Sequence, residues 1–242
     1  MSLLQEAILM ADQDSVQFVP VITVDGPSGS GKGTISQALA HHLGWHCLDS
    51  GLIYRVFAYV ADQQAIQPEQ EAALLKLIDD FSHSVQMKVI NTSLCVFWQE
   101  KEISSFVRSE ACGELASKFA ALPSVRTALL DYQRAFRQSP GLVADGRDMG
   151  TVVFPDAVLK IYLSASLEER AKRRYLQLKR WGKHVSLGAV QKELKQRDTR
   201  DTERKAAPLK AAEEALILDT THLSIPEVLQ RIQKTLAKKE LR

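Results

Sequence analysis

The chain has 242 residues, of which 45% are hydrophobic and 25% are charged, and its formal net charge is +2. These values are ordinary for a folded globular protein and exclude fibrous and intrinsically disordered classes. Cys47, Cys95 and Cys112 lie far apart and form no C-x-x-C pair. We therefore expect neither a disulfide framework nor a zinc site, and a reducing cytoplasmic location fits this cysteine content.

Residues 1–20 are expected to form an N-terminal extension outside the folded core. Their apolar patch, residues 7–10, is short and is flanked by Glu6 and Asp12. A signal peptide begins with basic residues and has a longer apolar segment, and a membrane span needs about 20 apolar residues. The extension is predicted to be neither, and no membrane partner is expected.

The most informative stretch is residues 21–34. A β-branched run stops at Asp25, three glycines follow within six positions, and a helical pattern begins at Ile35. The spacing G-x-x-x-x-G-K predicts a strand, a phosphate-binding loop whose N–H groups and lysine hold phosphates, and a helix whose positive end faces them. The alternative is a glycine-rich turn with an unrelated lysine. The residues expected to bind phosphate are Gly26, Pro27, Ser28, Gly29, Ser30, Gly31, Lys32, Gly33 and Thr34.

The rest of the chain alternates predicted strands and helices, which indicates an α/β fold. The short apolar segments predicted as strands are residues 21–24, 45–48, 142–145, 158–163 and 215–219. Helices are predicted over residues 105–121, 124–137 and 225–241. Four further helices are predicted from their starts alone, after residue 34, after residue 49, at Ser166 and near Ser186.

Residues 64–104 interrupt this alternation. They contain an amphipathic helix over 68–81 and an antiparallel hairpin over 85–98. We expect an inserted α+β subdomain here, so that residues 21–63 and 105–242 form the core domain.

One strand ends in a carboxylate, Asp145. In phosphate-loop proteins a second strand ending in aspartate lies beside the loop and holds Mg²⁺ or its water shell. Asp145 is therefore the predicted metal residue. Thr34 is a second candidate, although Gly33 separates its hydroxyl from Lys32 and the usual position is directly after the lysine.

Residues 168–210 carry fourteen Lys or Arg against six Asp or Glu. In a chain with a phosphate loop this run favours arginines that clamp anions, and a solvated helix face or a nucleic-acid surface are the alternatives. Only Tyr175 and Trp181 could stack on bases there. No nucleic-acid partner is expected.

Four ordered motifs make the chain resemble bacterial cytidylate kinases from about residue 21 to its end. They read VDGPSGSGKGT, LDSGLIYR, ADGRDMGTVVFP and RDTRD, beginning at residues 24, 48, 144 and 197. The resemblance implies a monomeric enzyme that uses ATP and Mg²⁺ to phosphorylate CMP or dCMP. It also implies a P-loop kinase fold with five parallel strands in the order 2-3-1-4-5, a monophosphate-binding insert, and a short lid near residues 168–185.

The resemblance further implies roles for individual residues. Lys32, Arg147, Arg197 and Asp145 are expected at the catalytic centre, because phosphoryl transfer needs its negative charge neutralised. The residues expected to bind CMP are Ser50, Arg55, Ser117, Arg126, Arg147, Asp148, Arg197, Asp201 and Arg204.

Among these, the arginines suit phosphate because their planar fork binds two oxygens at once. Arg126 and Asp148, with Ser117, are expected to read cytosine, and Asp201 to bind the sugar hydroxyl. Ser117 as a helix-packing residue is the alternative for that position. Arg200 is not expected to bind CMP, because we expect it to point outward and form an ion pair with Asp198.

Three other functions stay open at this point. A kinase of a different monophosphate would share the fold but not the cytosine contacts. A nucleic-acid-binding protein would use the basic run and show binding that weakens steeply with salt. A phosphate-loop switch would hydrolyse nucleotide without any acceptor.

Overall fold

The computed structural model describes residues 18–90 and 93–238. Its main sheet is parallel and has the strand order β2-β6-β1-β7-β8. The strands are β1 (Val21–Asp25), β2 (His46–Asp49), β6 (Leu142–Gly146), β7 (Leu159–Ser164) and β8 (Leu216–Asp219). Numbered among themselves, these strands run 2-3-1-4-5, so the predicted order is confirmed.

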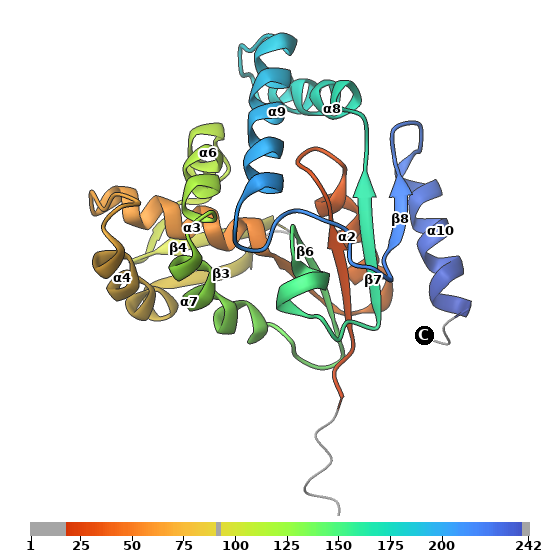
Figure 1. Ribbon diagram of the computed structural model, residues 1–242, viewed down its shortest axis with the longest axis horizontal. Helices are drawn as coiled ribbons and strands as arrows, with labels where there is room; N and C mark the ends of the chain where they lie inside the picture. Colours follow the sequence, from red (N-terminus) through yellow and green to blue (C-terminus); the bar gives the residue numbers. More distant parts are fainter. Residues whose placement is uncertain (1–17, 91–92, 239–242) are drawn as a thin grey trace, which may run out of the picture.

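Strands β1 and β6, in the interior of the sheet, are mostly apolar because helices cover both faces of the sheet (Figure 1). All residues of β1 and β6 are buried. Their register pairs Val24 with Asp145 and Asp25 with Gly146. The phosphate loop that follows β1 and the segment that follows β6 therefore leave the same edge of the sheet, side by side.

The helices largely follow the predicted pattern. They are α2 (Lys32–Leu43), α3 (Ser50–Gln63), α4 (Glu71–Ser84), α5 (Ser104–Val107), α6 (Glu110–Phe119), α7 (Pro123–Arg134), α8 (Leu167–Arg180), α9 (Leu187–Glu203) and α10 (Ile225–Lys238), with a π-helix at Met149–Val153. The single helix expected over 105–121 is wrong, because the chain forms α5 and α6 instead. Ser109 separates them by capping α6, its hydroxyl accepting from the N–H of Cys112 at 3.2 Å.

The predicted hairpin is present as β3 (Val85–Ile90) and β4 (Ser93–Trp98), and β5 (Lys101–Glu102) adds a third antiparallel strand. Its turn, residues 91–92, lies outside the described residues. Phe81 of α4 packs edge-on against Phe57 of α3, in the apolar cluster that also contains β6 residues. The boundary of the insert stays a prediction.

Two large apolar clusters hold the sheet between its helices, one around Phe57 on the α3 and α7 side and one around Ile22 and Leu39 on the α2 and α10 side. A third, small cluster of Ala171, Leu178, Val190 and Leu194 joins α8 to α9. Figure 1 shows this helical pair above the carboxyl ends of the parallel strands. Within residues 18–90 and 93–238, no helix combines the length and apolarity of a membrane span.

Gly26 begins the phosphate loop where β1 meets β7. Its φ is +146°, and a Cβ there would lie 2.0 Å from the carbonyl oxygen of Leu163. We expect Gly26→Ala to lower the free energy of unfolding by about 3 kcal/mol or more, because backbone must move and the angle is strained. Urea denaturation measures this. Gly188→Ala is the control, since a Cβ there meets nothing within 4 Å, and equal stability of the two variants would refute the prediction.

Candidate active site

A cleft of about 870 Å³ opens at the carboxyl ends of the strands. The phosphate loop and α2 form one wall, α3, α6 and α7 another, and α8 and α9 lie over it. All predicted site residues except Gly26 and Pro27 line this cleft. Segments more than 100 residues apart in sequence thus contribute to one site.

Lys32 lies at the start of α2, directly after Gly31, which has a left-handed φ of 95°. Its Nζ donates to the carbonyl oxygen of Pro27 at 2.9 Å, so the lysine side chain folds back onto the phosphate loop. The side chain is buried, and burial, followed by the neighbouring charge of Arg147, lowers its pKa. A polyphosphate in the loop would favour the charged form again.

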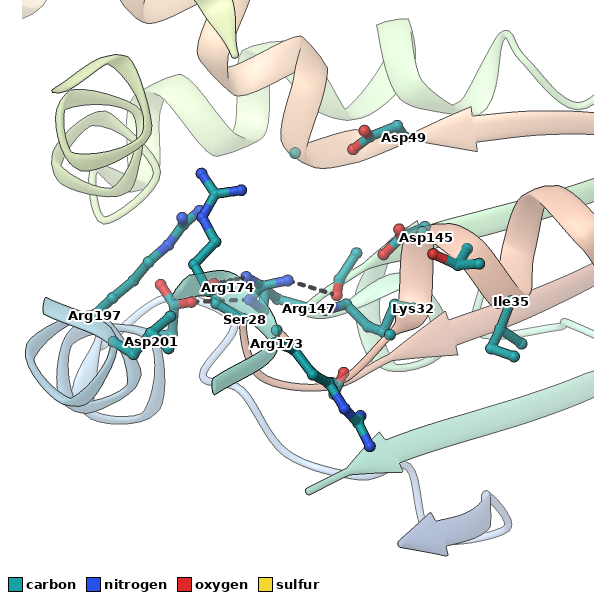
Figure 2. Close-up of a pocket in the computed structure, with 18 of the residues that line it drawn as sticks. Ser28, Lys32, Ile35, Asp49, Asp145, Arg147, Arg173, Arg174, Arg197 and Asp201 are labelled. Atoms are coloured by element: carbon teal, nitrogen blue, oxygen red, sulfur yellow. Dashed lines mark hydrogen bonds and ion pairs between the residues drawn. The ribbon is translucent and has the colours of Figure 1, made fainter. Parts of the chain in front are cut away.

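Asp145 lies beside Lys32 at the end of β6 (Figure 2). Burial raises its pKa, and the charge of Lys32 opposes that rise. Gly33 allows α2 to begin this close, since a Cβ there would lie 3.3 Å from Asp145 Oδ2. Thr34 is exposed within the cleft.

These residues fit Mg²⁺, which is usually held by one or two carboxylates, substrate phosphates and water. Among the described residues no group of three or more His, Cys, Asp or Glu could hold a metal ion alone. A cation bound at Asp145 would also offset the cost of burying that carboxylate. The contact of Thr34 with a metal stays a prediction.

Arg147 connects the phosphate loop to α9. Its Nη2 donates to Ser28 Oγ at 2.7 Å, and its Nε donates to Asp201 Oδ2 at 2.9 Å, as Figure 2 shows. Burial by itself would raise the pKa of Asp201, but Arg147 and Arg197 outweigh it and keep that pKa below its ordinary value. Ser117 Oγ lies 3.5 Å from Asp201 Oδ1, so its hydroxyl is buried against a polar partner.

At the far end of the cleft, Asp148 lies between two arginines. Its Oδ2 pairs with Arg126, and its Oδ1 is 3.5 Å from Nη2 of Arg204. Asp148 is only 2% exposed. Arg126 also lies over the ring of Tyr54, with 5.6 Å between the guanidinium carbon and the ring centroid. This end can recognise a flat, polar ring through a fixed carboxylate and fixed N–H donors.

Cations crowd the middle of the cleft. Arg174 and Arg197 point into the same space from α8 and α9 (Figure 2). Burial, and next the charge of Arg147, lowers the pKa of Arg197 to about 9. Arg55 donates to the carbonyl oxygens of Val107 and Ser109 at 2.9 and 2.7 Å. Anionic groups bound here would relieve the repulsion among these arginines.

Comparison with known proteins identifies the family. The family profile described as cytidylate kinase matches residues 22–238. The chain belongs to the cytidylate kinase family.

Its relatives match over nearly their whole length. A cytidylate kinase of Stutzerimonas stutzeri (strain A1501) is 52% identical over 226 residues, which are 93% of this chain and 99% of the relative. One of Nitrosococcus oceani is 54% identical over 214 residues, 88% of this chain and 94% of the relative. One of Aeromonas salmonicida (strain A449) is 53% identical, with 89% and 93% covered.

In this member of the cytidylate kinase family, the arginines of the basic run, residues 168–210, make different kinds of contact. Arg170 is 6% exposed and donates to the carbonyl oxygen of Ser28 and to Asp198, so it ties α8 and α9 to the phosphate loop. Arg173 donates to the carbonyl oxygen of Thr220, away from Arg174. Arg174 faces the cleft and pairs with Glu110.

One expected ion pair is wrong. Asp198 pairs with Arg170 at 2.6 Å, whereas Arg200 Nη1 lies 3.8 Å from Glu114 of α6. Arg200 is close to Asp198 in sequence, but residues two apart do not face each other on a helix, and α8 supplies a buried arginine to that carboxylate instead.

Asp25 does not line the cleft but supports two of its segments, a role that the sequence did not predict. Its two carboxylate oxygens accept from the N–H groups of Met149 and Gly150, each at 2.8 Å. Asp25 therefore ties the start of the phosphate loop to the segment carrying Arg147 and Asp148. The position directly before the loop glycine was the available signal, but its partners lie 124 and 125 residues away.

Asp25 should also make stability depend on pH. Burial raises its pKa from the ordinary 3.8 to about 6, although the two N–H bonds oppose that rise. The folded protein therefore holds this proton more tightly than the unfolded chain, and the resulting stabilisation is present below about pH 4 and lost as the pH rises through 6. At 1.36 kcal/mol for each unit, the loss is about 3 kcal/mol.

Asp25→Asn cannot ionise, so it removes this pH dependence. In the variant, the side-chain N–H₂ replaces one of the two oxygens that accept from backbone N–H groups. Two donors then face each other, which lowers the free energy of unfolding by about 1–3 kcal/mol at every pH. The unchanged protein should lose about 3 kcal/mol of unfolding free energy between pH 4 and pH 7 through Asp25, and the variant should not. The difference in unfolding free energy, variant minus unchanged protein, should therefore rise by about 3 kcal/mol over this range. Urea unfolding at intervals across this range measures the difference, and a constant difference would contradict the assignment.

Proposed function

We propose that this protein transfers the γ-phosphoryl group of ATP to CMP or dCMP, giving ADP and CDP or dCDP. The observation that carries the proposal is the position of Asp148. A carboxylate 2% exposed and held by Arg126 and Arg204 lies in the same cleft as a phosphate loop. Such a pair of subsites suits one polyphosphate and one base-bearing acceptor.

The transfer breaks the bond from the γ-phosphorus to the oxygen that bridges to the β-phosphate, and forms a bond to an oxygen of the acceptor phosphate. The transition state is loose, so the protein mainly positions the reactants and neutralises charge. Residues 26–34 hold the donor phosphates, and Lys32 stabilises the moving group. Arg55 and Arg147 bind the acceptor phosphate, with Arg197 and Arg204 close to the reacting groups.

Base selection follows from hydrogen-bond polarity. Cytosine offers an amino group and the acceptors O2 and N3, whereas uracil has O4 in place of the amino group. Asp148 accepts from the amino group and Arg126 supplies donors. Ser117, whose hydroxyl donates to Asp201, contributes its oxygen beside the base, and Ser50 and Asp201 bind the nucleoside end. A buried site built for one set of partners can reject the other by about 10⁴ or more, because its polar groups are left unpaired.

Mg²⁺ is the proposed metal, with Asp145 and Thr34 holding it directly or through water. When bound, it neutralises phosphate charge and helps to orient the donor. Movement of the insert and of a lid near residues 168–185 is proposed to exclude water, which would otherwise accept the phosphoryl group. A monomer in a reducing cytoplasm is the proposed state, and the three described cysteines are free.

Formation of ADP from ATP and Mg²⁺ in the presence of CMP, dCMP, UMP, AMP, GMP or no acceptor tests the proposal. Rapid turnover with CMP and dCMP alone is the expected result. Preference for another monophosphate would keep the phosphate loop and overturn the base assignment. Equal turnover without acceptor would indicate a nucleotide-hydrolysing switch, and salt-sensitive binding of DNA or RNA would favour the nucleic-acid alternative.

A further inference from the structure

Helix α7 presents two polar residues on its buried face. Arg126 and Gln133 are seven residues apart, which is about two helical turns, so they share the face that also buries Leu129. Gln133 is 1% exposed. A buried amide needs partners for both its oxygen and its nitrogen, because each unpaired group costs about 1–3 kcal/mol.

The partners of Gln133 fix the orientation of its amide. Its Nε2 donates to the carbonyl oxygen of Leu129 at 3.1 Å. Since a carbonyl oxygen only accepts, the amide nitrogen must lie on that side and Oε1 on the other. Oε1 accepts from the hydroxyl of Ser50 at 2.7 Å.

The same reasoning fixes the proton of Ser50. An amide oxygen cannot donate, so the Ser50 hydroxyl gives its only hydrogen to Gln133. Ser50 lines the cleft and is 3% exposed. Its oxygen therefore offers the cleft lone pairs and no donor.

Ser50 belongs to the end of the cleft that holds Asp148. It lies on α3 one turn before Tyr54, and residues four apart share a helix face. The ring of Tyr54 lies under the Arg126 guanidinium, which pairs with Asp148. Two acceptors, the Asp148 carboxylate and the Ser50 oxygen, thus belong to one subsite.

We propose that Gln133 is a positioning residue for acceptor selection, because it fixes the Ser50 hydroxyl as a hydrogen-bond acceptor toward the base. The inference rests on the proposed function. An exocyclic amino group has two N–H donors, one for Asp148 and one for Ser50. The O4 atom of uracil would face two acceptors, and the Ser50 hydroxyl could not rotate to help it without losing Gln133.

The test is the ratio of kcat/KM for CMP to that for UMP. Gln133→Met keeps the size of the side chain but frees the Ser50 hydroxyl to donate. We expect the ratio to fall by about tenfold or more, with kcat/KM for UMP rising. Gln133→Glu still offers an oxygen to Ser50, and its ratio should stay close to that of the unchanged protein. Gln138→Met, at an exposed glutamine just past α7, is the matched control.

A double-mutant cycle with Ser50→Ala separates positioning from packing. If Gln133 acts through Ser50, adding Gln133→Met to Ser50→Ala leaves the ratio unchanged. Equal losses with CMP and UMP in Gln133→Met, and therefore an unchanged ratio, would overturn the proposal and indicate a packing role. Failure of the unchanged protein to prefer CMP would instead overturn the proposed function.

Thermal melting shows which variants fold. If Gln133→Met does not fold, the other two variants decide the question. A ratio retained in Gln133→Glu and lowered in Ser50→Ala is the expected result. A ratio that Ser50→Ala leaves unchanged would overturn the proposal.

Discussion

Lys32→Met is expected to lower kcat by at least about 10²–10³ while leaving the protein as stable as before or more stable. The lysine is the buried cation of the phosphate loop, and its loss removes charge at the place where the γ-phosphoryl moves. Burial of the ammonium group lowers its pKa, which means that the folded state holds the charged form at a cost. Methionine fills similar space without that cost.

Two measurements on the same sample test this combination. The first is kcat with saturating ATP and CMP, and the second is the free energy of unfolding in urea. Lys234→Met, at an exposed lysine of α10 that does not line the cleft, is the control and should change neither. A parallel loss of activity and stability would mean that Lys32 acts mainly by supporting the loop through its bond to Pro27.

Asp148→Asn is expected to lower kcat/KM for CMP by at least about 10³ and to reverse part of the preference over UMP. In the variant, the amide oxygen can still accept from Arg126. The N–H₂ group then takes the place of the second oxygen, so the side facing the base has a donor instead of an acceptor. A donor suits O4 of uracil and opposes the amino group of cytosine. The affinity for ATP, which binds at the other end of the cleft, should change little.

The substitution also removes the charge shared by Arg126 and Arg204. Breaking a buried ion pair from one side costs about 3–5 kcal/mol, so unfolding must be measured beside the kinetics. Asp131→Asn is the control, because that carboxylate on α7 is 94% exposed. If CMP turnover and ATP affinity fall together, Asp148 has a structural role and does not read the base.

Local sequence was sufficient to predict the strands and the phosphate-loop wall of the cleft, whereas the strand order and the acceptor-binding residues came from the resemblance to cytidylate kinases. Strand β1, its glycine loop and α2 are consecutive, and Asp145 ends a strand whose apolar residues mark it as buried. Each of these signals lies within a few residues. The break at Ser109 was also readable, because a serine followed by Glu110 is typical of a helix start.

The missed residues depend on contacts that no local pattern contains. Arg170 and Arg174 lie one turn apart on a basic helix, yet one supports the phosphate loop and the other faces the cleft. Gln133 resembles any polar residue of an amphipathic helix until Ser50, 83 residues away, is placed beside it. Which polar side chain points inward is decided by how the helices pack on the sheet.

The small cluster that joins α8 to α9 has a consequence for motion. Its apolar residues pack with each other and belong to neither of the two large clusters that hold the sheet. The helical pair is tied to the rest through ion pairs, including Arg174 with Glu110 and Arg147 with Asp201. Swinging the pair outward would break polar contacts that water can replace, and would expose little apolar surface. Such an opening would be separated from unfolding, so we expect substrate exchange to be faster than hydrogen exchange of the buried amides in β1 and β6.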